Sequence, residues 1–167
     1  MGYDAALNKA WQDLKGLNLP AVVSVKFLQD EYSVNIGQHK MLSLSCNIPA
    51  KDFTAILILH YLIRSAKGLP NIRGEWLTFR EFSGIEGYSD AFKKRAIEPL
   101  IRKFVKRKSE DSVTTIEAFP GVPVLLKFWK ADSEFGADAN IYFDKSIKDI
   151  FCTEDIVVLA GLVAGHI

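Results

Sequence analysis

The chain has few of the residues that metal-binding and disulfide-stabilised proteins need. Only two of its 167 residues are cysteines, Cys46 and Cys152, and they lie far apart. Two cysteines cannot build a disulfide scaffold or a four-cysteine zinc or iron–sulfur site. The three histidines show no metal-ligand spacing, and we interpret His60 as a core histidine rather than a metal or tetrapyrrole ligand. The sequence therefore predicts no metal site.

Neither sign of charge dominates the chain. There are 21 Lys and Arg residues against 20 Asp and Glu residues, a formal net charge of +1. Such a balance argues against bulk attraction to nucleic acid or to anionic lipid. The segment Lys93–Lys108 is locally basic, but half of its helical arc is apolar and must face a core. We interpret its basic residues as a solvated face and predict no nucleic-acid partner.

Long apolar runs are also missing. The most apolar stretches, Ala55–Ile63 and Ile156–Gly165, are half the roughly 20 residues that a membrane-spanning helix needs. The first residues lack the basic start and apolar core of a signal peptide. We expect a soluble cytoplasmic protein with no membrane partner.

No nucleotide-binding or hydrolase motif is present. The chain contains no phosphate-binding GxxxxGK[ST] loop, no GxGxxG, no HExxH and no GxSxG. The sequence therefore names no catalytic residue and no cofactor, and it favours a protein that is not an enzyme.

Hydrophobic spacing predicts both helices and strands. Residues 22–46 alternate apolar and polar side chains, which is typical of a three-stranded antiparallel meander with one wet face. Further strands are predicted at Val113–Ala118, Val122–Trp129 and Ala139–Asp144, and a short one at Trp76–Phe82. Helices are predicted at 4–17, 53–66, 89–106 and 154–163, with Pro99 kinking or restarting the third.

These elements together predict one α+β domain over residues 1–167. Phe53–Ala66 is apolar nearly all round, which is typical of a buried helix. The strands fall into two clusters with helices between them rather than into regular βαβ units. We expect antiparallel sheet in two strand clusters, packed around this buried central helix, with a docked C-terminal helix.

One segment combines arginines with aromatic residues around a glycine-bearing turn. Arg80, Tyr88 and Arg95 lie among Phe79, Phe82 and Phe92. Arginine supplies forked hydrogen-bond donors and aromatic rings supply walls, so this set can form a pocket for an anionic or planar ligand. It can equally be a structural clasp between a loop and a helix.

A second segment gathers carboxylates after a predicted strand. Asp132, Glu134 and Asp138 imitate the start of a calcium loop, but Ala137 and Phe143 occupy the positions that need glycine and glutamate. Two carboxylates can also perform general acid–base chemistry. We favour a simple turn, in which the acids bind backbone amides.

Two blocks of the sequence resemble the domain of unknown function 3786 family of anaerobic bacteria and archaea. The likeness covers about residues 50–165. The first block contains Leu59-His60-Tyr61-Leu62, Ala66, Gly68, Pro70, Gly74, Phe79-Arg80-Glu81, Gly87-Tyr88, Phe92 and Arg95. The second block contains Trp129, Asp132, Glu134-Phe135, Phe143-Asp144, Ser146 and Glu154-Asp155.

The resemblance implies a metabolic setting but no activity. Some relatives are fused to an iron–sulfur segment like that of the corrinoid iron–sulfur subunit of acetyl-CoA synthase systems, which implies anaerobic corrinoid or one-carbon metabolism. The two cysteines of this chain cannot hold such a cluster. The matching polar and aromatic positions mark either a shared site or a shared core. If Ala139–Asp144 pairs with Val122–Trp129, Asp144 lies far from the 131–138 loop.

The leading hypothesis is a non-catalytic accessory module that binds a small anionic or planar ligand, or a partner protein. Its candidate ligand-binding residues are Arg80, Tyr88, Arg95, Trp129, Asp132 and Glu134. One alternative is an enzyme that uses Asp132 and Glu134 for acid–base chemistry. The other is an interaction module or homodimer formed through an exposed strand edge.

Overall fold

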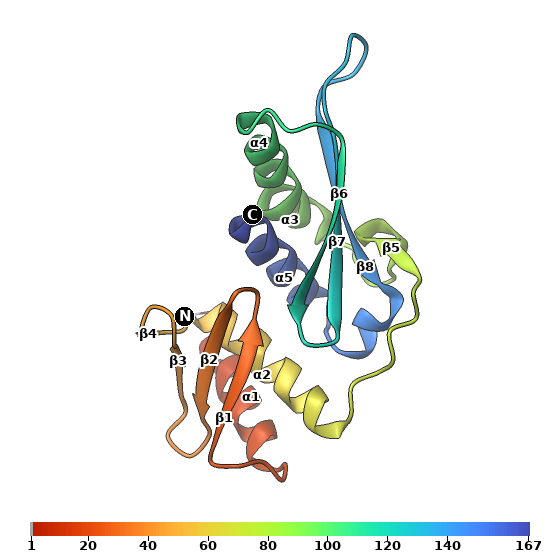
Figure 1. The fold of residues 1–167 in the computed structure, drawn as a ribbon. Coiled ribbons are helices and arrows are strands. Elements are labelled where there is room, and N and C mark those ends of the chain that lie inside the picture. Colours follow the sequence, from red (N-terminus) through yellow and green to blue (C-terminus); the bar gives the residue numbers. More distant parts are fainter. Residues whose placement is uncertain (1) are drawn as a thin grey trace. The chain divides into compact units, whose positions relative to one another are not determined.

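A computed structural model describes residues 2–167 and confirms an α+β fold with two antiparallel sheets. The chain divides into two compact units, one ending at Pro70 and the other comprising Asn71–Ile167. Each unit contains one four-stranded sheet and its own helices (Figure 1). No helix in the described part of the chain is long and apolar enough to cross a membrane.

The first unit is an antiparallel sheet with two helices. Its strands follow the order β1-β2-β3-β4, so the predicted three-stranded meander is confirmed and a two-residue strand is added to it. The predicted strand pattern extends too far, because β3 ends at Ser43 and residues 44–47 form a turn in which Leu44 and Cys46 are exposed. Val25, Phe27 and Val34 are buried while Ser24 and Lys26 are exposed, as the period of two predicts. The elements are α1 (Asp4–Lys15), β1 (Val22–Phe27), β2 (Asp30–Asn35), β3 (Lys40–Ser43), β4 (Ile48–Pro49) and α2 (Asp52–Lys67).

Helix α2 is the predicted buried helix. Its residues Thr54–Leu59, Tyr61 and Leu62 are buried, and His60 is half-buried. It packs against α1 within the first unit. A helix with apolar side chains around most of its circumference is stable only when it is covered on several sides.

The second unit places its helices on one face of the other sheet (Figure 1). The strand order is β5-β8-β7-β6, and every pairing is antiparallel. Val122, Val124, Leu126 and Phe128 of β7 are buried, and the residues between them are at least partly accessible. The elements are β5 (Trp76–Thr78), α3 (Ser89–Phe92), α4 (Glu98–Lys106), β6 (Ser112–Phe119), β7 (Val122–Trp129), β8 (Asp138–Asp144) and α5 (Thr153–His166), the C-terminal helix.

The helical stretch after Ser89 is interrupted, as Pro99 predicts. A π-helical segment, η2 (Lys93–Ile97), separates α3 from α4, and Pro99 lies in the first turn of α4. Proline has no N–H and its ring crowds the carbonyl four residues earlier, so a regular α-helix cannot continue through it.

The predicted strand Trp76–Phe82 begins at the right residue but extends too far at its C-terminal end. Strand β5 ends at Thr78, and a 3₁₀ turn, η1 (Phe79–Glu81), follows. The Glu81 carboxylate accepts hydrogen bonds from the Thr78 N–H (2.6 Å) and hydroxyl (3.2 Å), which closes the turn at once. Because β5 is so short, no strand of the described chain lies beside the first half of β8 on that side.

Candidate functional site

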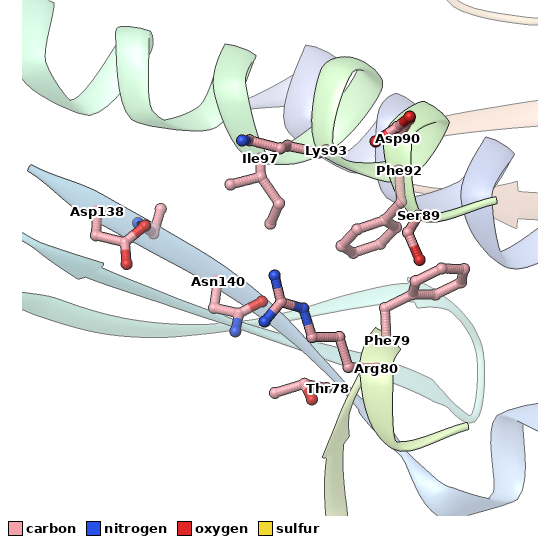
Figure 2. Close-up of a pocket in the computed structure, with 11 residues that line it drawn as sticks. Thr78, Phe79, Arg80, Ser89, Asp90, Phe92, Lys93, Ile97, Asp138 and Asn140 are labelled. Atoms are coloured by element: carbon pink, nitrogen blue, oxygen red, sulfur yellow. Dashed lines mark hydrogen bonds between the residues drawn. The ribbon is translucent and has the colours of Figure 1, made fainter. Parts of the chain in front are cut away.

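A pocket of about 440 Å³ lies in the second unit, between η1, the helical stretch after Ser89 and the beginning of β8. Figure 2 shows the helical wall above the strand, with Arg80 between them. The pocket lies where β5 stops short. Its lining residues are Thr78, Phe79, Arg80, Ser89, Asp90, Phe92, Lys93, Ile97, Asp138, Ala139 and Asn140.

Arg80 is the sequence-predicted residue that enters this pocket. It lies in η1, is exposed, and extends its guanidinium toward Asn140 (Figure 2). Within residues 2–167 no salt bridge or hydrogen bond engages the Arg80 side chain. Its forked donors are therefore available to a carboxylate or phosphate in the pocket.

Two aromatic rings form the apolar wall. Phe79 and Phe92 stack with their centroids 4.3 Å apart and their planes at 5°, and both side chains are buried. Phe82, from the same predicted motif, packs instead against Phe143 in the core, at a centroid distance of 6.3 Å. The motif therefore supplies both a pocket wall and part of the core.

The charged groups of the lining balance each other. Arg80 and Lys93 are bases, and Asp90 and Asp138 are acids. The lining has no net charge that would attract an anion, so recognition of an anion must depend on where the individual charged side chains lie. Figure 2 shows the carboxylate of Asp138 at the far end of the drawn residues from Phe79.

Arg95 does not line the pocket. A Cβ built on Gly161 of α5 would lie 3.4 Å from the Arg95 carbonyl oxygen and 3.6 Å from its Cβ. The backbone and Cβ of Arg95 therefore lie against α5 while the residue is exposed, whereas Lys93 and Ile97 from the same segment line the pocket. The half-buried Tyr88 precedes α3, where its carbonyl accepts the Phe92 N–H at 2.9 Å, and it is not a lining residue either.

Trp129, Asp132 and Glu134 belong to the β7–β8 hairpin, whose loop projects beyond the rest of the sheet (Figure 1). Trp129 pairs with Asp138 and is 41% exposed. The Asp132 carboxylate accepts the N–H groups of Phe135 (2.7 Å) and Glu134 (2.8 Å). These two hydrogen bonds lower the pKa of Asp132.

The loop after Trp129 is a simple turn whose carboxylate binds backbone amides, as the sequence predicts. Asp132 and Glu134 are both exposed and neither lines the pocket. Among residues 2–167 no group of three or more His, Cys, Asp or Glu side chains is arranged to hold a metal ion. Nothing in this geometry favours acid–base chemistry by the two carboxylates.

Asp144 lies at the opposite end of β8, as the predicted pairing requires. Its buried carboxylate accepts hydrogen bonds from the N–H groups of Arg73 (3.0 Å), Gly74 (2.8 Å) and Ser146 (3.0 Å), and from the Ser146 hydroxyl (2.6 Å). Burial alone would raise the pKa of Asp144, but these hydrogen bonds outweigh it and the pKa is lowered. Asp144 therefore fixes the chain before β5.

Sequence reasoning missed the residues that face Arg80. Asn140 is an ordinary polar position of an alternating strand, and Lys93 is one of eight bases in a solvated-looking segment. They become lining residues only because β5 pairs with β8, which places η1 beside Asn140, and because the helical segment that carries Lys93 lies over this strand. No local signal in the sequence marks either one.

A family model described as "Domain of unknown function (DUF3786)" matches residues 12–110 and 102–166. The chain belongs to this family. The resemblance predicted from residues 50–165 is thus confirmed, and the DUF3786 match begins nearer the N-terminus than expected. The comparisons with curated proteins and with solved structures found no match. The family description assigns no activity, so the function of this DUF3786 chain must be argued from its site.

Proposed function

We propose that this chain is a non-catalytic accessory module that binds a small carboxylate- or phosphate-bearing ligand in the pocket beside Arg80. The observation that carries the proposal is a guanidinium with no ion-pair partner in residues 2–167, directed across a pocket of about 440 Å³. Pockets of this size hold small metabolites, and a few polar groups among apolar walls fix their orientation.

The ligand should present an anionic group to Arg80 and an apolar or planar part to the stacked rings of Phe79 and Phe92. Arginine binds carboxylate and phosphate through two parallel hydrogen bonds, so it gives direction as well as attraction. Anaerobic corrinoid or one-carbon metabolism is the setting that the family resemblance implies. Two unpaired cysteines, both exposed, fit a reducing compartment and support a cytoplasmic location.

A thermal-shift screen tests the proposal. The classes to screen are corrinoids, folates, phosphorylated metabolites and small dicarboxylates. A ligand that binds the folded chain at 100 times its Kd stabilises it by about 2.7 kcal/mol, which a melting curve detects. If no class raises the melting temperature, the chain does not act by binding such ligands.

Arginine variants then locate the site. For any ligand found, Arg80→Ala should weaken binding at least tenfold, and Arg80→Lys should recover part of the loss because it keeps charge without the fork. Arg102→Ala is the matched control, since Arg102 is exposed on α4 and does not line the pocket. Equal binding by Arg80→Ala and the control would contradict the proposal.

The other sequence-predicted ligand residues are tested in the same assay. Arg95, Tyr88, Trp129, Asp132 and Glu134 lie outside the lining, so we expect their alanine variants to bind as the unaltered chain does. If Arg95→Ala weakens binding as much as Arg80→Ala does, both arginines take part in binding the ligand, as the sequence predicts.

A further inference from the structure

The hydrogen bonds between β5 and β8 show which backbone groups of β8 point outward at the edge beside Arg80. The Lys145 N–H donates to the Glu75 carbonyl at 2.9 Å, and Trp76 lies opposite Asp144. Glu75 and Lys145 are thus a hydrogen-bonded pair of an antiparallel ladder, in which such pairs alternate. The backbone groups of every second residue of β8, including Ala139 and Ile141, therefore point to the side on which β5 lies.

Within residues 2–167 no strand reaches Ala139 and Ile141 on that side, because β5 ends at Thr78, opposite Tyr142. Their N–H groups are satisfied locally. The Ala139 N–H donates to the Asp138 carboxylate at 2.8 Å, and the Ile141 N–H donates to the Asn140 side-chain oxygen at 2.9 Å. What this edge offers to an incoming molecule is therefore its carbonyl oxygens, which need N–H donors.

The pocket along this edge extends from the exposed Asp138 to the Phe79–Phe92 stack. Thr78 and the stacked rings of Phe79 and Phe92 stand where an added strand would run into β5. Figure 2 shows these rings at the opposite end of the drawn residues from Asp138, with Arg80 between. An extended chain that enters beside Asp138 must therefore end near Arg80.

We propose that the ligand of this pocket is the carboxyl-terminal segment of a partner polypeptide, added as a short strand parallel to β8. The terminal carboxylate binds Arg80, a backbone N–H donates to the Ala139 carbonyl, and an apolar last side chain packs against Phe92 and Ile97. The proposal rests on the anion-binding role of Arg80 proposed above. It adds the class of ligand and the direction in which it runs.

The charges and the blocked end exclude the other ways of adding a chain. An amino terminus at the blocked end would place an ammonium group against the Arg80 guanidinium. An internal segment would have to continue through the space that Thr78 and Phe79 occupy. A carboxylate on arginine combined with backbone pairing is a general means of capturing chain ends in extended form.

Nuclear magnetic resonance of the full ¹⁵N-labelled chain tests the proposal. The probe is a mixture of N-acetylated tetrapeptides with three randomised positions and a C-terminal leucine, prepared as the free acid. The same mixture prepared as the C-terminal amide is one control, and sodium acetate is the other. The free acids should shift the backbone amide signals of Asn140 and Tyr142, whose N–H groups share peptide units with the Ala139 and Ile141 carbonyls, and the Nε–H signal of Arg80. They should bind at least tenfold more tightly than the amides and than acetate. Arg80→Ala should abolish this preference, and Arg102→Ala should keep it.

Each other outcome overturns the proposal. If small anions bind in an Arg80-dependent manner but the peptide acids bind no better than acetate, the strand addition is wrong and the proposed function stands. If no anion of any kind binds through Arg80, both are wrong. If peptide acids bind through Arg80 but the amide signals of Asn140 and Tyr142 do not respond, the proposed backbone pairing is wrong. Concentration-dependent dimerisation that broadens these two signals would assign the edge to a second copy of the chain.

Discussion

Phe79 and Phe92 stack face to face across the pocket wall, with a centroid distance of 4.3 Å, although they belong to a 3₁₀ turn and a helix that are separated by a glycine-bearing loop. Phe92 also contacts Phe143 of β8 edge-on, at 6.4 Å. The stack therefore joins η1, α3 and the sheet. It fixes the turn from which Arg80 reaches into the pocket.

Removing one ring should destabilise the chain and loosen the pocket together. Phe92→Ala should lower the free energy of unfolding by about 3–5 kcal/mol, because it leaves a cavity in a packed aromatic cluster. The control is Phe135→Ala, since Phe135 is 70% exposed and its loss should change stability by no more than about 0.5 kcal/mol. Urea unfolding measures both. Similar effects of the two variants would show that the stack is not structural.

Asp144 should be the most sensitive carboxylate of the second unit. Replacing it by Asn removes the charge that four hydrogen bonds share, and we expect a loss of about 2–3 kcal/mol at pH 7. Asp149→Asn is the matched control, because Asp149 makes an exposed salt bridge to the same Arg73 segment and such pairs contribute about 0–1 kcal/mol. A control loss as large as that of Asp144 would contradict the role of the buried carboxylate.

The same carboxylate predicts a pH dependence. The pKa of Asp144 is lower in the folded chain than in the unfolded one, so the unfolded chain takes up this proton first as the pH falls. Its stabilisation is present above the ordinary aspartate pKa of about 4 and is lost below it. Unfolding curves at pH 7, 4 and 3 should show a smaller decline in Asp144→Asn than in the unaltered chain. Parallel declines would show that other groups cause the acid sensitivity.

Gly161 should accept only a small side chain. Its position would place a Cβ 3.4 Å from the Arg95 carbonyl, which is ordinary van der Waals contact, so Gly161→Ala should be neutral or stabilise the helix by up to about 1 kcal/mol. Gly161→Leu should cost about 1–3 kcal/mol, because its further atoms meet the π-helical segment. Gly165 has open space around its Cα, so Gly165→Leu serves as the control. A tolerated leucine at 161 would show that the two helices pack loosely.

Asp132 should act only within the hairpin loop. Asp132→Ala removes the acceptor of the Glu134 and Phe135 N–H groups, so these two amides should exchange with deuterium faster, while the melting temperature stays unchanged. Asp138→Ala is the comparison, because it frees the Ala139 N–H instead. Unchanged exchange at Glu134 and Phe135 would contradict the turn.

We predict that the whole chain unfolds as one domain, although its contacts divide it into two units. Units of 70 and 97 residues bury a smaller share of their surface than one body of 167, so each alone would be marginal. Scanning calorimetry should show one transition whose calorimetric and van't Hoff enthalpies agree. Two resolved transitions would contradict the single domain.

The regular elements could be predicted because their patterns are local. Phe53–Ala66 is apolar around its circumference, and Val122–Trp129 alternates, so neither needs a partner to be recognised. The boundaries were harder. The predicted helix 4–17 extends past the end of α1 at Lys15, and the predicted helix 53–66 begins one residue after the start of α2 at Asp52. The end of β5 was missed because the Glu81 side chain, three residues on, closes the turn.

The lining of the candidate site could be predicted only in part. Arg80 was identified from its aromatic neighbours in the sequence, and it lines the pocket. The prediction that Arg95 joins Arg80 in one pocket depended on which side of the helix Arg95 occupies. The π-helical segment before Pro99 changes the angle between successive side chains around the helix axis. Residue spacing in the sequence does not by itself determine the angular position of Arg95 around the helix.

By itself, the sequence determined the fold class, the buried helix, the two groups of antiparallel strands and the family, since each follows from the periodicity or order of nearby residues. Only the tertiary structure decided which side chains share a pocket. Arg80 and Asn140 are 60 positions apart in the chain, and they meet because β5 pairs with the far half of β8 and stops. Such a meeting depends on strand order and register, which involve residues too distant in the chain for any local pattern to record.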